Sequence, residues 1–250
     1  MILLNDKIFI HIPKTSGTNF RNNIIKTYSQ NDYSNYSLDS VDYKQFGNLN
    51  YNEINQIKKI SNESFDDIVI KHKEEYICIP KSEISKVYCY HIKHLPLNVW
   101  EKYSIYKNQS VFTIVRNPYT KFVSHYENTI DNLKLFFNFD KPTPKQFIYS
   151  ENINSIVSKI SGVDYKLNQV DYLTNISGNI VCDKFYKIET DQENISIDFN
   201  LPNLNKLKIN QRNYNRDYSN LYDDELINWV QETYKRDFEY FSYDISPFWR

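Results

Sequence analysis

The sequence predicts an α/β fold in which a central, mainly parallel sheet is flanked by helices. Two apolar runs carry this prediction: residues 7–12 read KIFIHI, and residues 111–115 read VFTIV. Each run has a β-type composition, and each is followed by a proline and then by a helical pattern. The second run is continuous and β-branched, which is typical of a parallel strand covered on both faces. Strands that alternate with helices favour a single parallel sheet.

Weaker patterns extend this α/β interpretation along the chain. The strongest helical period lies in residues 223–241, where one face carries Leu226, Ile227, Val230, Tyr234 and Phe238. Residues 28–51 are rich in Asn, Ser, Asp and Tyr without a clear period, so we expect a long excursion there. The other expected elements are strands at 87–90 and 180–182 and helices that begin near Thr18 and Pro118 and that cover 52–61, 144–160 and 168–174.

The composition is that of one globular domain spanning residues 1–250. Hydrophobic residues make up 40% of the chain and charged residues 24%, which excludes a disordered or collagen-like protein. No repeat or Pro/Gly-rich linker divides the chain, and residues 28–78 are expected to be a variable excursion from the domain. The net charge of −1 favours neither nucleic acid nor an anionic membrane as a partner.

The cysteine and hydropathy patterns predict a cytoplasmic protein without a resident metal. The three cysteines, Cys78, Cys89 and Cys182, lack the C-x-x-C spacing of a zinc site and leave an odd thiol. No apolar run approaches the roughly 18 residues of a membrane span, so no transmembrane segment is expected. The first residues also lack the basic and apolar regions of a signal peptide.

The loop after the first strand has the composition of a phosphate-binding turn. Residues 11–20 read HIPKTSGTNF, between the expected strand and helix. A helix N-terminus offers N–H groups and a positive dipole end to an anion, and Gly17 would let the backbone approach a ligand. The plain alternative is an ordinary Ser/Thr-capped helix start. The other candidate binding residues of the loop are Lys14, Thr15, Ser16, Thr18 and Asn19.

A second cluster of polar residues follows the VFTIV strand. Residues 116–126 read RNPYTKFVSHY. Because the carboxyl ends of parallel strands meet at one edge of a sheet, we expect Arg116 to lie beside the first loop. Its guanidinium can hold a phosphate bidentately, and Ser124, two helical turns on, can donate to the same group. An ion pair between Arg116 and a neighbouring helix is the alternative.

Together the two segments resemble the sulfotransferases that use 3′-phosphoadenosine-5′-phosphosulfate (PAPS), in particular the carbohydrate branch of heparan and chondroitin sulfate type and its bacterial relatives. The family's 5′-phosphosulfate loop reads like IPKTSGT, and its 3′-phosphate motif is similar to RNPYTKFVSHY. Ser16 departs from the family pattern, in which glycine is common. Weaker similarities are KHLP at 93–96, QxxYL at 169–173, FYKIE at 185–189 and the DF pair at 237–238. The resemblance implies a P-loop-like three-layer fold.

The resemblance also implies an activity: in-line transfer of a sulfuryl group from PAPS to a hydroxyl, with a carbohydrate as the favoured acceptor. Lys14 would stabilise charge on the leaving phosphate, and the loop backbone that follows it would hold the 5′-phosphate. Arg116 and Ser124 would bind the 3′-phosphate, and Arg212 is a further candidate for closing over it. No bridging metal ion is expected in such a site.

A histidine is the family's usual base for the hydroxyl proton, and imidazole has a suitable pKa near neutrality. His94 best matches the family's histidine segment, and His91 is the alternative or helper. His11 is expected to pack or hydrogen-bond beneath the loop. His125 lies inside the second motif and is expected to be structural or to face solvent.

Two other classes of function are alternatives. A P-loop nucleotide kinase would share the strand, loop and helix, but it would need the order G-x-x-x-x-G-K-[ST] and an acidic Mg²⁺ ligand at a strand end. In this sequence Lys14 precedes Gly17. The third class is a non-catalytic relative that only binds nucleotide or glycan, and the presence of Lys14, Arg116 and Ser124 argues against it.

Overall fold

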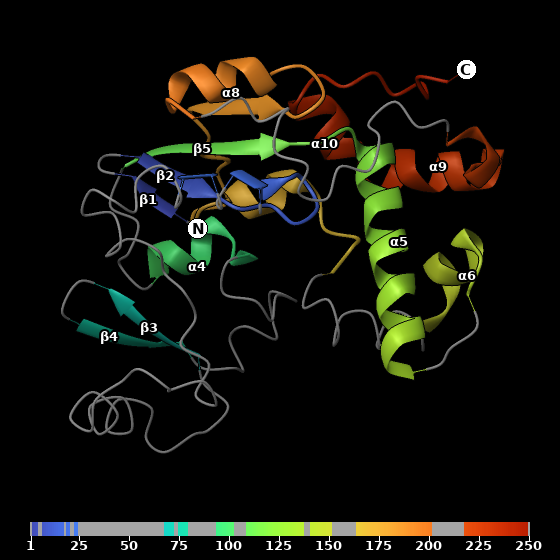
Figure 1. The fold of residues 1–250 in the computed structure, drawn as a ribbon, viewed down its shortest axis with the longest axis horizontal. Helices are drawn as coiled ribbons and strands as arrows, with labels where there is room; N and C mark the ends of the chain where they lie inside the picture. The colour runs from blue at the N-terminus through green and yellow to red at the C-terminus, as the bar shows by residue number, and fades with distance from the viewer. Residues whose placement is uncertain are drawn as a thin grey trace.

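The computed structural model has a four-stranded central sheet with the strand order β1-β2-β5-β6 (Figure 1). The structure describes residues 2–4, 7–17, 19–20, 23–24, 68–72, 75–79, 94–102, 109–137, 141–151, 164–201 and 218–249. Strands β2 (Lys7–Ile10), β5 (Ser110–Val115) and β6 (Lys184–Lys187) are parallel, and β1 (Ile2–Leu4) is antiparallel beside β2. This confirms the predicted parallel sheet and places the carboxyl ends of β2 and β5 side by side.

The strand expected at 180–182 lies further along the chain, at Lys184–Lys187. Ile180 forms only an isolated bridge. Asp183 sets the register, because its N–H donates to the Val111 carbonyl (2.8 Å) and its carboxylate accepts the Val111 N–H (2.6 Å). Both backbone groups of Val111 are thus held by one residue, and β6 begins directly after it.

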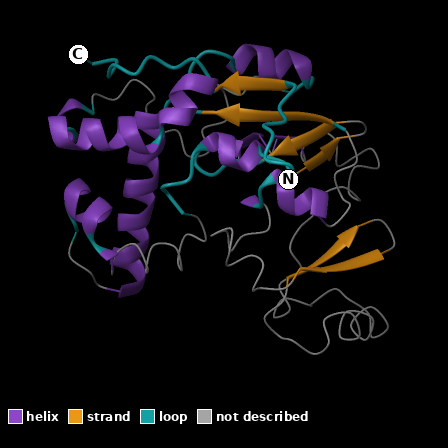
Figure 2. Cartoon of the chain, turned by 180° about the vertical axis from the view of Figure 1, so that it is seen from behind, coloured by secondary structure: helices purple, strands orange, loops and turns teal. Residues whose placement is uncertain are grey.

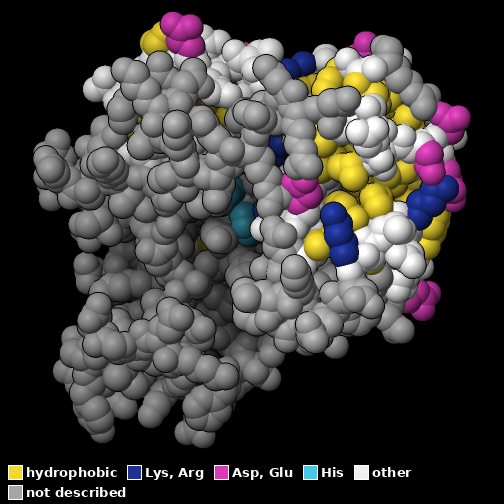
Figure 3. Space-filling view, turned by 45° about the vertical axis from the view of Figure 1, so that its right-hand side comes forward, with side chains coloured by type: hydrophobic (Ala, Val, Ile, Leu, Met, Phe, Trp, Pro, Cys, Tyr) yellow, Lys and Arg dark blue, Asp and Glu magenta, His cyan; other side chains and the backbone are white. Residues whose placement is uncertain are grey.

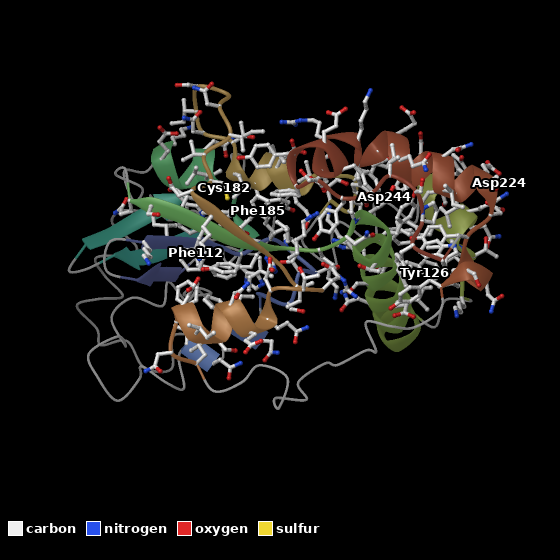
Figure 4. All side chains as sticks on the ribbon, turned by 90° about the horizontal axis from the view of Figure 1, so that it is seen from above. Phe112, Tyr126, Cys182, Phe185, Asp224 and Asp244 are labelled. Atoms are coloured by element: carbon white, nitrogen blue, oxygen red, sulfur yellow. The ribbon has the colours of Figure 1, made fainter. Side chains whose placement is uncertain are left out.

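Two apolar layers cover the sheet, as a three-layer fold requires (Figure 2). On one face, α4 (Leu97–Lys102) and the 3-10 helix η3 (Gln169–Leu173) pack against apolar side chains of the strands. On the other face, α8 (Gln192–Asp198) packs against a second buried cluster. Figure 4 shows Phe112 on the α8 side of the sheet and Phe185 on the η3 side. The sheet is therefore buried on both faces, which explains the continuous apolar run of β5.

A cluster of helices lies beyond the carboxyl end of β5 (Figure 1). Helix α5 (Pro118–Phe137) begins at Pro118, as predicted. Helix α6 (Pro144–Tyr149) begins at Pro144, also as predicted. Helices α9 (Asp224–Thr233) and α10 (Lys235–Tyr240) complete the cluster. Their shared core is rich in aromatic rings: Tyr119, Phe122, Tyr126, Phe147, Tyr165, Tyr222, Tyr234 and Phe238.

The single helix expected at 223–241 is interrupted at Tyr234. This residue has φ −108° and ψ 24°, so it ends α9 and precedes α10. The interruption has a physical reason, because α10 turns to pack against η3, where the buried Asp237 carboxylate accepts the Val170 N–H (3.1 Å). The predicted apolar face of 223–241 is nevertheless buried throughout.

The expected excursion at 28–78 contains part of a hairpin that the sequence did not predict. Strands β3 (Ile68–His72) and β4 (Glu75–Ile79) pair in antiparallel fashion. The helix expected at 52–61 and the strand expected at 87–90 lie outside the described residues. Within the part of the chain that the structure describes, no helix is both long and apolar enough to cross a bilayer.

Candidate active site

The turn after β2 holds two non-glycine residues in the left-handed conformation. Lys14 has φ 65° and Ser16 has φ 69°, on either side of Thr15. The buried Thr15 hydroxyl donates to the Ile12 carbonyl (2.9 Å) and so stabilises the turn from inside. The Ser16 carbonyl accepts the Asn19 N–H (3.0 Å) where a helix starts. Strained backbone of this kind persists only where its surroundings determine it, and it concentrates at ligand-binding sites.

Gly17 is required by the ring that lies beneath it. A Cβ atom at residue 17 would lie 2.0 Å from His11 Cδ2, far inside contact distance. The His11 ring is buried and packs against Phe9 (5.9 Å between ring centroids) and His94 (4.3 Å), so it has little room to move. His11 therefore packs beneath the loop as expected, and Gly17 is needed for this close approach.

The His94 ring is oriented by the backbone of the same loop. Its Nδ1 lies 2.9 Å from the His11 carbonyl oxygen. A carbonyl oxygen only accepts hydrogen bonds, so Nδ1 carries the proton and the neutral ring has its lone pair on Nε2. The backbone that follows is held as well, because Trp100 Nε1 donates to the Leu95 carbonyl (2.8 Å). The hydrogen bond thus leaves Nε2 as the acceptor nitrogen of the neutral His94 ring.

Arg116 joins the second motif to the first. Its Nη1 donates to the Lys14 carbonyl oxygen (3.3 Å), and its Nε donates to Thr120 Oγ1 (3.0 Å). The residue is buried, with only 7% of its surface exposed. Lys14 and Arg116 therefore meet at the carboxyl edge of the sheet, where ligands of open α/β sheets bind.

Several basic side chains lie close to His125. His125, on α5, has its pKa lowered well below the usual 6.5, first by burial and then by the neighbouring Lys121, Lys14, His94 and Arg116. Figure 3 shows a histidine side chain near the middle of one face, with atoms of basic side chains close to it. Cations gathered in a water-poor site favour an anionic ligand. His125 is buried (4% exposed), which agrees with the structural one of the two expectations for this residue.

Two further side chains lie on α5 or at its start. Ser124 is half-buried on the second turn after the helix start. Glu189, just after β6, accepts the Asn117 N–H (2.8 Å) and the Tyr243 hydroxyl (3.1 Å). A carboxylate at this N-terminus already satisfies the helix dipole. The backbone at the start of α5 is therefore already paired with a carboxylate of the chain itself.

Gln169 holds the backbone of Arg116 and was not predicted as a site residue. Its Oε1 accepts the Arg116 N–H (2.8 Å), and its Nε2 donates to the Arg116 carbonyl (2.9 Å). The same Nε2 donates to Asp237 Oδ2 (3.2 Å), which lies 3.8 Å from Lys121 Nζ. The sequence did contain a signal for Gln169 and Asp237, because QxxYL and the later DF pair resemble segments of the family's core.

Three predicted site residues lie outside the described residues: Thr18, His91 and Arg212. Asn19, another predicted binding residue, accepts a hydrogen bond from Asn23 Nδ2 at its own Oδ1 (3.1 Å). Among the side chains that the structure describes, no group of three or more His, Cys, Asp or Glu could hold a metal ion.

The fold and the site together define a class of protein. A parallel strand, a tight turn with Lys14 and Gly17 and a helix start form one half of the site, and Arg116 from the neighbouring strand end forms the other. This arrangement is that of a P-loop-like α/β protein with a candidate anion site at the carboxyl edge of its sheet.

The chain belongs to the sulfotransferase family. The family model matches residues 5–166, more than half of the chain, and this stretch includes both the first loop and the Arg116 motif. Comparison with curated proteins and with solved structures gives no match. As a member of this family, the chain is a PAPS-dependent sulfotransferase.

Proposed function

We propose that this sulfotransferase transfers the sulfuryl group of PAPS to a carbohydrate hydroxyl by in-line displacement. Lys14, Arg116 and Ser124 hold the donor, and His94 accepts the hydroxyl proton. The observation that carries the proposal is the contact between the Arg116 guanidinium and the Lys14 carbonyl (3.3 Å), because it brings both phosphate-binding motifs to one site.

The residues of the site fit a nucleotide that is anionic at both ends. The helix start at Gly17 offers backbone N–H groups to an anion. Arg116 supplies a second, separate cation with bidentate geometry. The basic side chains Lys121, Lys14 and Arg116 also lie close enough to His125 to lower its pKa, after the larger effect of burial, and such positive charge favours an anionic ligand.

Each residue then has a chemical role. Bound PAPS supplies the sulfuryl group and a phosphate as leaving group. Lys14 supplies positive charge for that phosphate, and the backbone of residues 16–18 holds it. Arg116 grips the 3′-phosphate, and Ser124 donates to the same group.

The proton of the acceptor hydroxyl needs a base. In our proposal His94 takes it at Nε2, since the hydrogen bond from Nδ1–H to the His11 carbonyl assigns the lone pair to Nε2. His91 is the alternative base. Replacing each histidine with glutamine distinguishes the two candidates. His94→Gln is expected to lower kcat by about 10²- to 10⁴-fold without weakening the binding of the product nucleotide, adenosine 3′,5′-bisphosphate (PAP). His91→Gln is expected to lower kcat much less. The reverse result would assign the base to His91.

A carbohydrate acceptor is supported by the resemblance of IPKTSGT and RNPYTKFVSHY to glycan-modifying enzymes. We expect the acceptor to be selected by the segments 28–78 and 131–169. The measurement is transfer of label from radiolabelled PAPS to a panel of glycans, with a simple phenol and an aliphatic alcohol as comparison acceptors. Label on a glycan supports the proposal, and label on the phenol or alcohol alone would contradict its carbohydrate part.

The donor site is tested by titrating the product nucleotide, adenosine 3′,5′-bisphosphate (PAP), against ADP with and without Mg²⁺. A metal-independent preference for PAP supports the sulfotransferase site. A Mg²⁺-dependent preference for ADP would favour a kinase, and tight PAP binding without any transfer would favour a binding protein. Lys14→Ala is expected to abolish transfer, with the exposed Lys145→Ala as the control. Near-normal turnover of Lys14→Ala would refute its role.

A further inference from the structure

The Gln169 side chain forms the hydrogen bonds to the Arg116 backbone that a neighbouring strand would otherwise form. The last pairing between β5 and β6 is Val115 with Lys187, and the Ile188 N–H donates to the Val115 carbonyl (3.0 Å). Arg116 is the first residue after β5, and the Gln169 side chain hydrogen-bonds to both of its backbone groups, at 2.8 and 2.9 Å. One side chain therefore holds the residue from which the guanidinium projects.

Gln169 is itself held by buried groups. It is 0% exposed, and its Nε2 also donates to Asp237 Oδ2 (3.2 Å). Asp237 in turn accepts the Val170 N–H at Oδ1 (3.1 Å), and its Oδ2 faces Lys121 Nζ (3.8 Å). A fully satisfied buried network of this kind fixes its members in one orientation.

The other end of Arg116 reaches the donor loop. Its Nη1 donates to the Lys14 carbonyl and its Nε to Thr120 Oγ1. A shift of the Arg116 backbone would therefore move the guanidinium relative to both Lys14 and Thr120. Because bidentate binding of a phosphate depends on the orientation of the guanidinium plane, such a shift would weaken that binding selectively.

We propose that Gln169 is a positioning residue of the donor site: by holding both backbone groups of Arg116, it sets the guanidinium for the 3′-phosphate of the nucleotide. Asp237 holds Gln169 in the orientation that this requires. The inference rests on the proposed function, in which Arg116 binds the 3′-phosphate.

The test compares two ligands that differ only in the 3′-phosphate, PAP and 5′-AMP. Gln169→Leu leaves both Arg116 backbone groups without their partner, so the affinity for PAP is expected to fall about tenfold or more while that for AMP changes less than about twofold. Both dissociation constants are measured by calorimetry or by competition. An unchanged ratio of PAP to AMP affinity in a folded variant would overturn the proposal.

Two further variants separate positioning from general loss of stability. Phe147→Leu removes a buried ring from the α6 side of the helix cluster and is expected to lower stability while keeping the ratio of the two affinities. Gln169→Met keeps the length and approximate volume of the side chain but can neither donate to nor accept from the Arg116 backbone, so it is expected to lower the ratio even where Gln169→Leu does not fold. An unchanged ratio in Gln169→Met would also overturn the proposal.

A double-mutant cycle with Arg116→Ala shows whether Gln169 acts through Arg116. If it does, adding Gln169→Leu to Arg116→Ala causes no further loss of PAP selectivity, whereas fully additive losses contradict the proposal. The wild-type affinities distinguish failure of the proposed donor site from failure of the proposed role of Gln169. If the wild type shows no preference for PAP over AMP, the proposed donor site fails; if it does and the ratio survives in the Gln169 variants, only the role of Gln169 fails.

Discussion

At the scale of single residues, the His11 ring occupies the space that a side chain at position 17 would need. A Cβ atom at position 17 would lie 2.0 Å from the buried His11 ring. We expect Gly17→Ala to destabilise the protein by about 1–3 kcal/mol, because the ring has packed neighbours on both sides. Turnover should also fall, since the His11 carbonyl orients His94. Urea unfolding and the transfer assay measure the two effects.

The matched variant adds His11→Ala to Gly17→Ala. Removing the ring makes room for the new methyl group, so the double variant is expected to be more stable than the sum of the two single losses predicts. Strict additivity of the two changes would show that the clash with the ring is not the reason for glycine at this position.

His125 is the second feature at this scale, because it is buried among cations. Burial and the neighbouring Lys121, Lys14, His94 and Arg116 lower its pKa well below 6.5, so the native state keeps the ring neutral. The unfolded chain takes up a proton near pH 6.5, and the native chain does so only at much lower pH. Stability contributed by this residue is therefore present above pH 6.5 and is lost as the pH falls below it.

The expected outcome is a difference between wild type and His125→Gln that depends on pH. As the pH falls below 6.5, the free energy of unfolding of the wild type should drop by up to about 1.4 kcal/mol per pH unit relative to the variant. Urea titrations at a series of pH values from 7.5 to 5.5 measure this difference. Parallel profiles for the two proteins would show that His125 titrates normally in the native state.

At the scale of an element, α6 shows how local sequence sets a helix boundary. Thr143 Oγ1 accepts the Gln146 N–H (3.2 Å), and Gln146 Oε1 accepts the Thr143 N–H (2.8 Å), which together form a capping box before Pro144. Thr143→Ala is expected to lower the free energy of unfolding by about 1 kcal/mol, measured in urea. Thr143→Ser keeps the hydroxyl and should retain most of this stability. Equal losses in both variants would contradict the capping role.

At the scale of the whole molecule, one buried ion pair links α5 with α10 and η3. Lys121 and Asp237 are 1% and 0% exposed, and Lys121 Nζ also donates to the Leu167 carbonyl (2.7 Å). Burial lowers the pKa of Lys121 and raises that of Asp237, while their mutual attraction opposes both shifts. The sequence gives no sign that these two residues, far apart in the chain, share one pocket.

Breaking this pair is expected to be costly. Lys121→Met leaves the Asp237 carboxylate buried without its cation, so we expect a loss of about 3–5 kcal/mol in urea unfolding. Adding Asp237→Asn removes the stranded charge, and the double variant should lose much less than the sum of the single losses. Lys145→Met, which breaks only an exposed ion pair, is the control with a small effect. A similarly small loss in Lys121→Met would contradict the structural role of the pair.

Structural features that depend on residues close together in the chain could be predicted from the sequence alone. The apolar runs of β2 and β5, Pro118 at the start of α5 and the loop with Lys14 and Gly17 all follow from local patterns. These patterns record which face of an element is buried and where a chain must turn. The sequence by itself therefore determined the parallel sheet, the position of the two motifs on it and the family that they resemble.

Contacts between distant segments were decided only by the tertiary structure. Four features depend on partners elsewhere in the chain. They are the end of α9 at Tyr234, the start of β6 after Asp183, the packing of the His11 ring under Gly17 and the hydrogen bonds between Gln169 and Arg116. Hydrophobic periodicity carries no information about which buried polar group will meet which. The side chains that orient Arg116 and His94 became visible only once packing had brought these segments together.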